Sequence, residues 1–89
     1  MSSADRCAAL RNRARRCARK KQYRKAALAL REAAALDGAP ATWTMLGAML
    51  RRARREGEAI VALRQAEWLH RRAGSVGRAA AVARLIATG

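Results

Sequence analysis

The residues with the clearest chemical potential in this sequence are its cations. The chain has 20 Lys and Arg residues against 6 Asp and Glu, which gives a formal net charge of +14. Residues 6–25 alone hold ten basic side chains and no acidic one. Guanidinium groups bind carboxylates and phosphates through paired hydrogen bonds, so the sequence predicts a surface that attracts acidic protein, nucleic acid or anionic lipid. A genome biased towards Ala and Arg codons is the alternative origin of these charges.

Residues arranged for catalysis are missing from the sequence. The six carboxylates lie on four separate predicted elements without paired spacing, and no glycine-rich phosphate loop occurs. The single histidine, His70, precedes Arg71 and Arg72, and we expect it to be solvated at a helix end, where the helix dipole favours positive charge. Two cysteines and one histidine are too few for a closed tetrahedral metal site. We therefore expect no enzymatic activity, no metal and no cofactor.

The two cysteines, Cys7 and Cys17, are ten residues apart and form no C-x-x-C motif. This pattern indicates buried packing or free thiols in a reducing compartment. The N-terminal residues lack the basic segment and apolar core of a signal peptide. The sequence also has no run of about 20 apolar residues that could cross a membrane. These observations predict a cytoplasmic protein without a membrane partner.

Helices are expected to position the cations, because strand signals are absent. Hydrophobic residues make up 52% of the chain, but many are alanine and none is phenylalanine. Alanine, leucine and arginine favour helices, and no alternating β-branched run or Asn-Gly hairpin turn occurs. Apolar periodicity predicts an all-α domain of about five antiparallel helices, over residues 5–21, 23–36, 41–55, 57–72 and 76–87.

The strongest helical pattern lies in residues 40–66. Two apolar sets recur there at helical spacing, the first being Trp43, Leu46, Gly47 and Leu50, and the second Ala59, Leu63 and Ala66. Each set forms one stripe on a helix, and the small residues Gly47 and Ala59 would let the two helices approach closely. This helical hairpin resembles the tetratricopeptide repeat (TPR) family, whose pattern here is W-x-x-L-G-x-x-L followed by A-x-x-x-L-x-x-A. The resemblance implies a short TPR-like α-solenoid.

A weaker copy of this hairpin precedes it. Ala26, Leu30 and Ala33 lie 33 residues before the second stripe of the strong copy. Arg13 stands at the place of Leu46, so the first copy is degenerate. We expect a single TPR-like domain over residues 1–89, with repeat one at about 7–39, repeat two at about 40–73 and a terminal helix at about 76–87.

The TPR resemblance also implies where a partner binds. In that family the first helix of each pair lines a concave groove that holds a peptide, and some members clamp a carboxylate with Lys, Arg and Asn. The corresponding residues in this sequence are Arg11, Asn12, Arg15, Arg19, Thr44, Ala48, Arg51 and Arg52. Thr44 and Ala48 replace polar residues of such a clamp. The resemblance implies a non-enzymatic adaptor or chaperone-like subunit that binds an acidic or amphipathic segment of a partner protein.

Several apolar side chains have no evident destination within the chain: Met45, Met49, Trp68, Leu85 and Ile86. Helical repeat arrays usually need about three repeats to be stable, and this sequence has two and one further helix. We therefore expect an exposed apolar surface that a partner protein or a second copy of the chain covers. An economical monomer is the alternative.

Nucleic-acid binding by the basic first helix is the alternative function. Ten cations without an acidic neighbour would make strong, salt-sensitive phosphate contacts. Only Asn12, Gln22 and Tyr23 lie near them as residues that read or stack on bases, so this function ranks second. Membrane-surface binding ranks third, because the helix lacks an insertion face of Trp, Phe and Leu.

Overall fold

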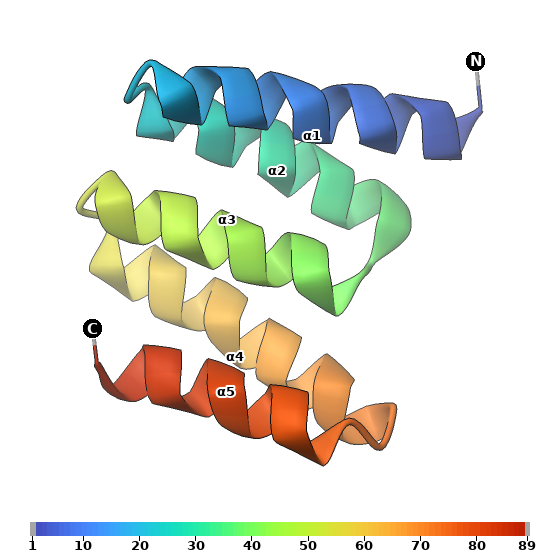
Figure 1. The fold of residues 1–89 in the computed structure, drawn as a ribbon, viewed down its shortest axis with the longest axis vertical. Coiled ribbons are helices and arrows are strands. Elements are labelled where there is room, and N and C mark those ends of the chain that lie inside the picture. The colour runs from blue at the N-terminus through green and yellow to red at the C-terminus, as the bar shows by residue number, and fades with distance from the viewer. Residues whose placement is uncertain (1, 89) are drawn as a thin grey trace.

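The computed structural model describes residues 2–88, which form five helices (Figure 1). They are α1 (Ser3–Arg19), α2 (Tyr23–Asp37), α3 (Pro40–Arg52), α4 (Glu56–Arg72) and α5 (Val76–Ala87). No strand occurs among the described residues, and the predicted all-α fold of five antiparallel helices is confirmed. The largest difference in bounds is at the end of α3, where residues 53–55 form the turn into α4 instead of a further helical turn.

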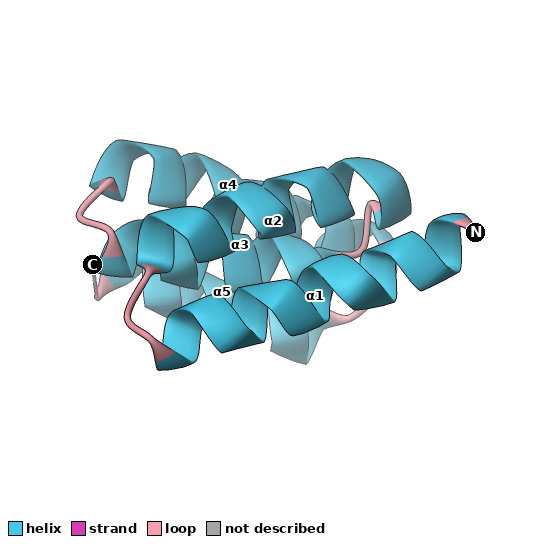
Figure 2. Ribbon diagram, turned by 90° about the horizontal axis from the view of Figure 1, so that it is seen from above, coloured by secondary structure: helices cyan, strands magenta, loops and turns pink. Residues whose placement is uncertain are grey.

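The helices pack in chain order and alternate between two layers. Figures 1 and 2 show α1, α3 and α5 in one layer and α2 and α4 in the other. α2 packs against α1 and α3, and α4 packs against α3 and α5. The body measures 32 × 30 × 17 Å. The basic helix α1 therefore lies at one end of the stack and α5 at the other.

Local sequence signals set the helix ends. The Ser2 hydroxyl accepts a hydrogen bond from the Asp5 N–H (3.2 Å), and the Asp5 carboxylate accepts one from the Ser2 N–H (3.4 Å), which is a capping box. Gly38 ends α2 with a φ of 59°, in the left-handed region that glycine adopts without a Cβ clash. Pro40 begins α3, where no N–H donor is needed.

The turns that follow α1, α3 and α4 share one geometry. Their central residues, Lys21, Arg54 and Gly74, have φ values of 60°, 63° and 77°. In each turn the next N–H bonds to the carbonyl five residues earlier: Gln22 to Cys17 (2.8 Å), Arg55 to Leu50 (2.9 Å) and Ser75 to His70 (2.8 Å). These are Schellman turns, which usually have glycine at the left-handed position. The same turn returns the chain each time from the first layer to the second or back.

The core consists mostly of alanine and leucine. Three residue pairs that are 33 positions apart are all at most 2% exposed: Ala26 and Ala59, Leu30 and Leu63, and Ala33 and Ala66. A Cβ built on Gly47 would lie only 2.6 Å from Leu63 Cγ. The small residues therefore bring the helix backbones close together, which is how a chain without phenylalanine fills its core.

The first hairpin has Arg13 at the position equivalent to the buried Leu46, and the structure gives the reason. Leu46 is 2% exposed, because α3 is covered by α2 as well as by α4. Its counterpart Arg13 is exposed, because α1 is the first helix and packs against α2 alone among its larger helix contacts. An arginine at this position therefore faces solvent.

Candidate partner-binding groove

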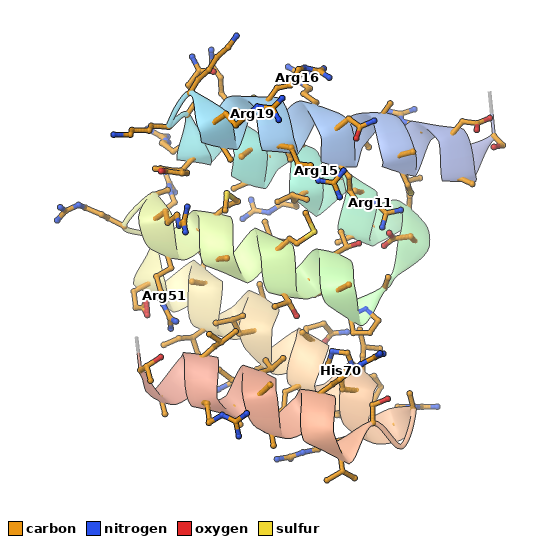
Figure 3. All side chains as sticks on the ribbon, viewed as in Figure 1. Arg11, Arg15, Arg16, Arg19, Arg51 and His70 are labelled. Carbon is orange, nitrogen blue, oxygen red and sulfur yellow. The ribbon has the colours of Figure 1, made fainter. Side chains whose placement is uncertain are left out.

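Three of the predicted binding residues form a row along α1. These groove arginines, Arg11, Arg15 and Arg19, lie on the face of α1 shown towards the viewer in Figure 3, where Arg11 and Arg15 extend towards α3. Arg11 is half-buried, and its Nη1 lies 3.7 Å from Asp37 Oδ2. Arg15 donates a hydrogen bond to Asn12 Oδ1 (3.1 Å). Within residues 2–88 no carboxylate pairs with Arg15 or Arg19, so their charge is available to a ligand.

An apolar hollow of about 140 Å³ lies beside the groove arginines, between α1 and α3. Apart from the Arg15 side chain, its lining residues are apolar: Ala14, Ala18, Leu30, Met45, Ala48 and Met49. Methionine is flexible and polarisable, so it adapts to ligands of different shape. We call this hollow together with the groove arginines the groove.

Arg51 does not join the groove arginines. Its Nε donates to both carboxylate oxygens of Glu56 (2.8 and 3.0 Å), and its Nη1 donates to the Leu85 carbonyl (2.6 Å). The hydrogen bond from Arg51 lowers the pKa of the Glu56 carboxyl and raises that of the Arg51 guanidinium. Arg51 Nη2 is buried without a hydrogen-bond partner. The side chain ties the end of α3 to the start of α4 and the end of α5 (Figure 3), so its position differs from the groove position that the sequence predicts.

The remaining predicted groove residues have contacts of their own. Thr44 donates its hydroxyl to the Pro40 carbonyl within α3 (2.9 Å). The Arg52 guanidinium lies 5.7 Å from the centre of the Tyr23 ring, which is a cation–π distance. Ala48 is exposed and lines the hollow. The structure thus brings Ala48 together with the groove arginines, while Thr44 and Arg52 bond to residues outside the hollow.

The five apolar residues expected on an exposed surface fall into two classes. Met45 and Met49 are half-buried against the larger core cluster, and Ile86 is half-buried against the cluster of Leu63, Ala66 and Val82. The expectation that these three lack intramolecular contacts is therefore wrong, because neighbouring helices cover one side of each. Trp68 and Leu85 remain exposed, at 51% and 42%. The Arg72 guanidinium lies 4.9 Å from the centre of the Trp68 ring.

His70 is buried, at 8% exposure. The expectation of a solvated helix-end histidine is wrong, because the last turn of α4 is covered in the stack and only Arg71 and Arg72 face solvent. Both cysteines are free thiols, and the Cys7 thiol lies 3.8 Å from the Ala33 carbonyl in the core. No group of three or more metal-ligating side chains forms within the described residues.

Three residues that line the hollow were not among the predicted binding residues. Ala14 and Ala18 belong to the apolar stripe of α1, and Leu30 belongs to that of α2. Their edges line the hollow because α3 does not cover the whole stripe. The usable signal was the interleaving of Ala14 and Ala18 with Arg15 and Arg19, which places small apolar residues beside the cations on one helix face.

No family model, curated protein or solved structure matches this chain. Among residues 2–88, none of the five helices combines the length and apolarity needed to cross a membrane. The groove and the charges around it are therefore the features that bear on function.

Proposed function

We propose that this chain is a short TPR-like interaction module, without enzymatic activity, that serves as an adaptor or chaperone-like subunit. Its ligand is an amphipathic, acidic segment of a partner protein, bound in the groove between α1 and α3. The observation that carries this proposal is the apolar hollow of about 140 Å³ that Arg15 helps to line, with Arg19 about one helical turn further along α1. Neither arginine has a carboxylate partner in the described chain.

Membership of the TPR family is part of the proposal. It is supported by the three residue pairs that recur after 33 positions at equivalent buried places and by the Schellman turns shared by Lys21 and Arg54, also 33 positions apart. The close contact at Gly47 adds further support. A hairpin repeated with its turn and its small residues is what stacked helical repeats require.

The groove suits a ligand with one apolar face and one acidic edge. A cavity of about 150 Å³ accepts a benzene-sized group, so the hollow takes one apolar side chain between Met45 and Met49. Each apolar side chain that is fully buried contributes about 1.5–3 kcal/mol before the entropic costs of binding. Carboxylates on the ligand's edge meet Arg15 and Arg19, and they add orientation and association rate more than affinity.

Two further parts of the proposal concern location and assembly. The free thiols Cys7 and Cys17 suit a reducing compartment, and we place the protein in the cytoplasm. The exposed Trp68 and Leu85 support contact with a partner subunit or with a second copy of the chain.

Binding of two synthetic peptides tests the groove. One peptide carries leucines along one helical face, flanked by glutamates; the other has the same composition in an order that destroys the apolar stripe. Fluorescence anisotropy of the labelled peptides measures affinity. We expect the striped peptide to bind at least about tenfold more tightly, the equivalent of about 1.4 kcal/mol.

Variants locate the binding surface. Ala48→Glu places a bulky anion beside the hollow and is expected to weaken the striped peptide at least about tenfold. Arg15→Gln with Arg19→Gln should weaken it and reduce its salt dependence. The matched control is Arg64→Gln with Arg78→Gln, which removes the same charge from exposed sites on α4 and α5. Equal binding of both peptides, or equal loss in the control, would mean that net charge alone attracts them.

A further inference from the structure

A second, strongly basic hollow lies at the turn between α1 and α2. It has a volume of about 460 Å³ and is lined by Arg13, Arg16, Cys17, Lys20, Gln22 and Lys25. We call it the basic hollow. The four cations in it are exposed, and none of them donates a side-chain hydrogen bond to another described residue.

The basic hollow faces away from the groove. At about 3.6 residues per turn, the positions of Arg16, Lys20 and Arg13 lie about 100–160° around α1 from Arg15, the middle of the row of groove arginines. Figure 3 shows Arg16 pointing away from α3, at the edge of the molecule, while Arg11 and Arg15 point towards α3. A ligand in the basic hollow would therefore leave the groove accessible.

The six Asp and Glu side chains, all within residues 2–88, make their contacts outside the basic hollow. Asp5 caps α1 by bonding to Ser2. The other acids accept from side chains outside the basic hollow: Glu32 from Arg6, Asp37 from Thr42, Glu56 from Arg51, Glu58 from Arg31 and Arg55, and Glu67 from Arg71. Hydrogen bonds from Arg31 and Arg55 also lower the pKa of Glu58, which keeps it ionised in that contact. No described carboxylate lines the basic hollow. Glu32 lies with Arg13 and Lys25 around a neighbouring hollow, but it pairs with Arg6. The four cations therefore outnumber the nearby carboxylates, and the positive potential of the basic hollow extends into solvent.

We propose that the basic hollow binds the phosphate backbone of a nucleic-acid duplex. Arg13, Arg16 and Lys20 follow one face of α1 over about 10 Å at 1.5 Å per residue, and Lys25 adds a cation from α2. A duplex carries one negative charge per about 1.7 Å of its axis, so such a row can meet several phosphates at once. The site is independent of the groove and does not rest on the protein-binding function proposed for it.

The lining of the basic hollow favours this ligand over two others. Cys17 is its least polar residue, and it is half-buried, so an amphipathic protein segment would find little apolar surface there. The apolar stripe of α1, including Cys7 and Ala14, is buried and cannot insert into a lipid bilayer. No aromatic side chain lines the basic hollow, so bases have no stacking platform and recognition is limited to the backbone, without sequence preference.

Salt-dependent binding of a labelled DNA duplex of about 20 bp tests the proposal. In a plot of the logarithm of the binding constant against the logarithm of the salt concentration, each phosphate contact contributes about −0.9 to the slope. Four contacts therefore predict a slope of about −3.6. Affinity should fall about 150-fold between about 50 and 200 mM salt. The variant Arg13→Gln, Arg16→Gln, Lys25→Gln should make the slope shallower by about 2.7 and leave binding of the striped peptide unchanged. Far-UV circular dichroism should show native helicity, because all three side chains are exposed.

A charge-matched control separates a site from net charge. Arg64→Gln, Arg78→Gln, Arg84→Gln removes the same three charges from exposed positions on α4 and α5, and its slope should stay within about 1 of that of the parent chain. The proposal is overturned if this control flattens the slope as much as the first variant does. It is also overturned if vesicles containing phosphatidylserine bind in a way that depends on the basic hollow while the duplex does not.

Discussion

Substitution of Gly47 by alanine tests the close approach of α3 and α4 on which the fold depends. A Cβ at this position would lie 2.6 Å from Leu63 Cγ, 2.7 Å from Leu63 Cδ2 and 3.3 Å from the Ala59 carbonyl oxygen. Carbon atoms pack best at about 3.5–4.0 Å, so the new methyl group overlaps Leu63 by about 1 Å. Leu63 is 2% exposed and has no solvent side into which it can move.

Two opposing effects set the magnitude. Alanine is favoured over glycine inside a helix by about 1 kcal/mol, whereas overpacking a tight core costs about 1–3 kcal/mol. The overlap involves Cγ, a branch point close to the backbone, and we therefore place the packing cost at the upper end. We expect Gly47→Ala to lower the free energy of unfolding by about 1–2 kcal/mol, which for a domain of this size lowers Tm by about 4–16 °C.

Urea and thermal unfolding followed by circular dichroism measure the effect. Gly77→Ala in α5 is the matched control, because a Cβ there meets no atom within 4 Å, and it should leave stability unchanged or raise it. In a Leu63→Ala background, which removes the clashing atoms, Gly47→Ala should become stabilising; an osmolyte keeps this weakened chain folded. A steric clash between residue 47 and Leu63 is refuted if Gly47→Ala has the same stability as Gly77→Ala in the parent chain, or if Gly47→Ala changes stability equally in both backgrounds.

Two further predictions concern the turns and the Arg51 contact. Arg54 has a φ of 63°, a conformation in which a side chain lowers stability by about 1 kcal/mol, so Arg54→Gly should raise the urea midpoint. Gly74 has a φ of 77°, so Gly74→Ala should lower the midpoint. Equal midpoints for both variants and the parent chain would contradict the turn geometry. The hydrogen bond from Arg51 lowers the pKa of Glu56 below its ordinary value of 4.5. Ionised Glu56 therefore stabilises the fold above that value, and this contribution is lost as pH falls through the lowered pKa. Glu56→Gln should reduce stability at neutral pH and flatten the loss of stability in acid, and parallel pH profiles would refute the contact.

The helices were predictable because their determinants are local. Capping at Ser2, the stop at Gly38 and the start at Pro40 act within a few residues, and so does the spacing of Leu46 and Leu50 on one helix face. The close contact at Gly47 was also predictable, because a small residue within an apolar stripe lets a neighbouring helix approach closely. The predicted end of α3 was three residues too late. The turn there depends on the left-handed conformation of Arg54, which is not expected from an arginine in the sequence.

The sequence by itself determined the all-α class, the hairpin unit and the excess of positive charge, since composition and helical periodicity are properties of short segments. Only the tertiary structure decided which arginines keep their charge available. Arg51 is held by a carbonyl 34 residues away, in Leu85, and Arg11 lies near Asp37, across the α1–α2 pair. By contrast, Arg15 and Arg16 have no carboxylate partner among residues 2–88. Ion pairing depends on distances of a few ångströms between residues far apart in the chain, and these distances exist only after the helices have packed.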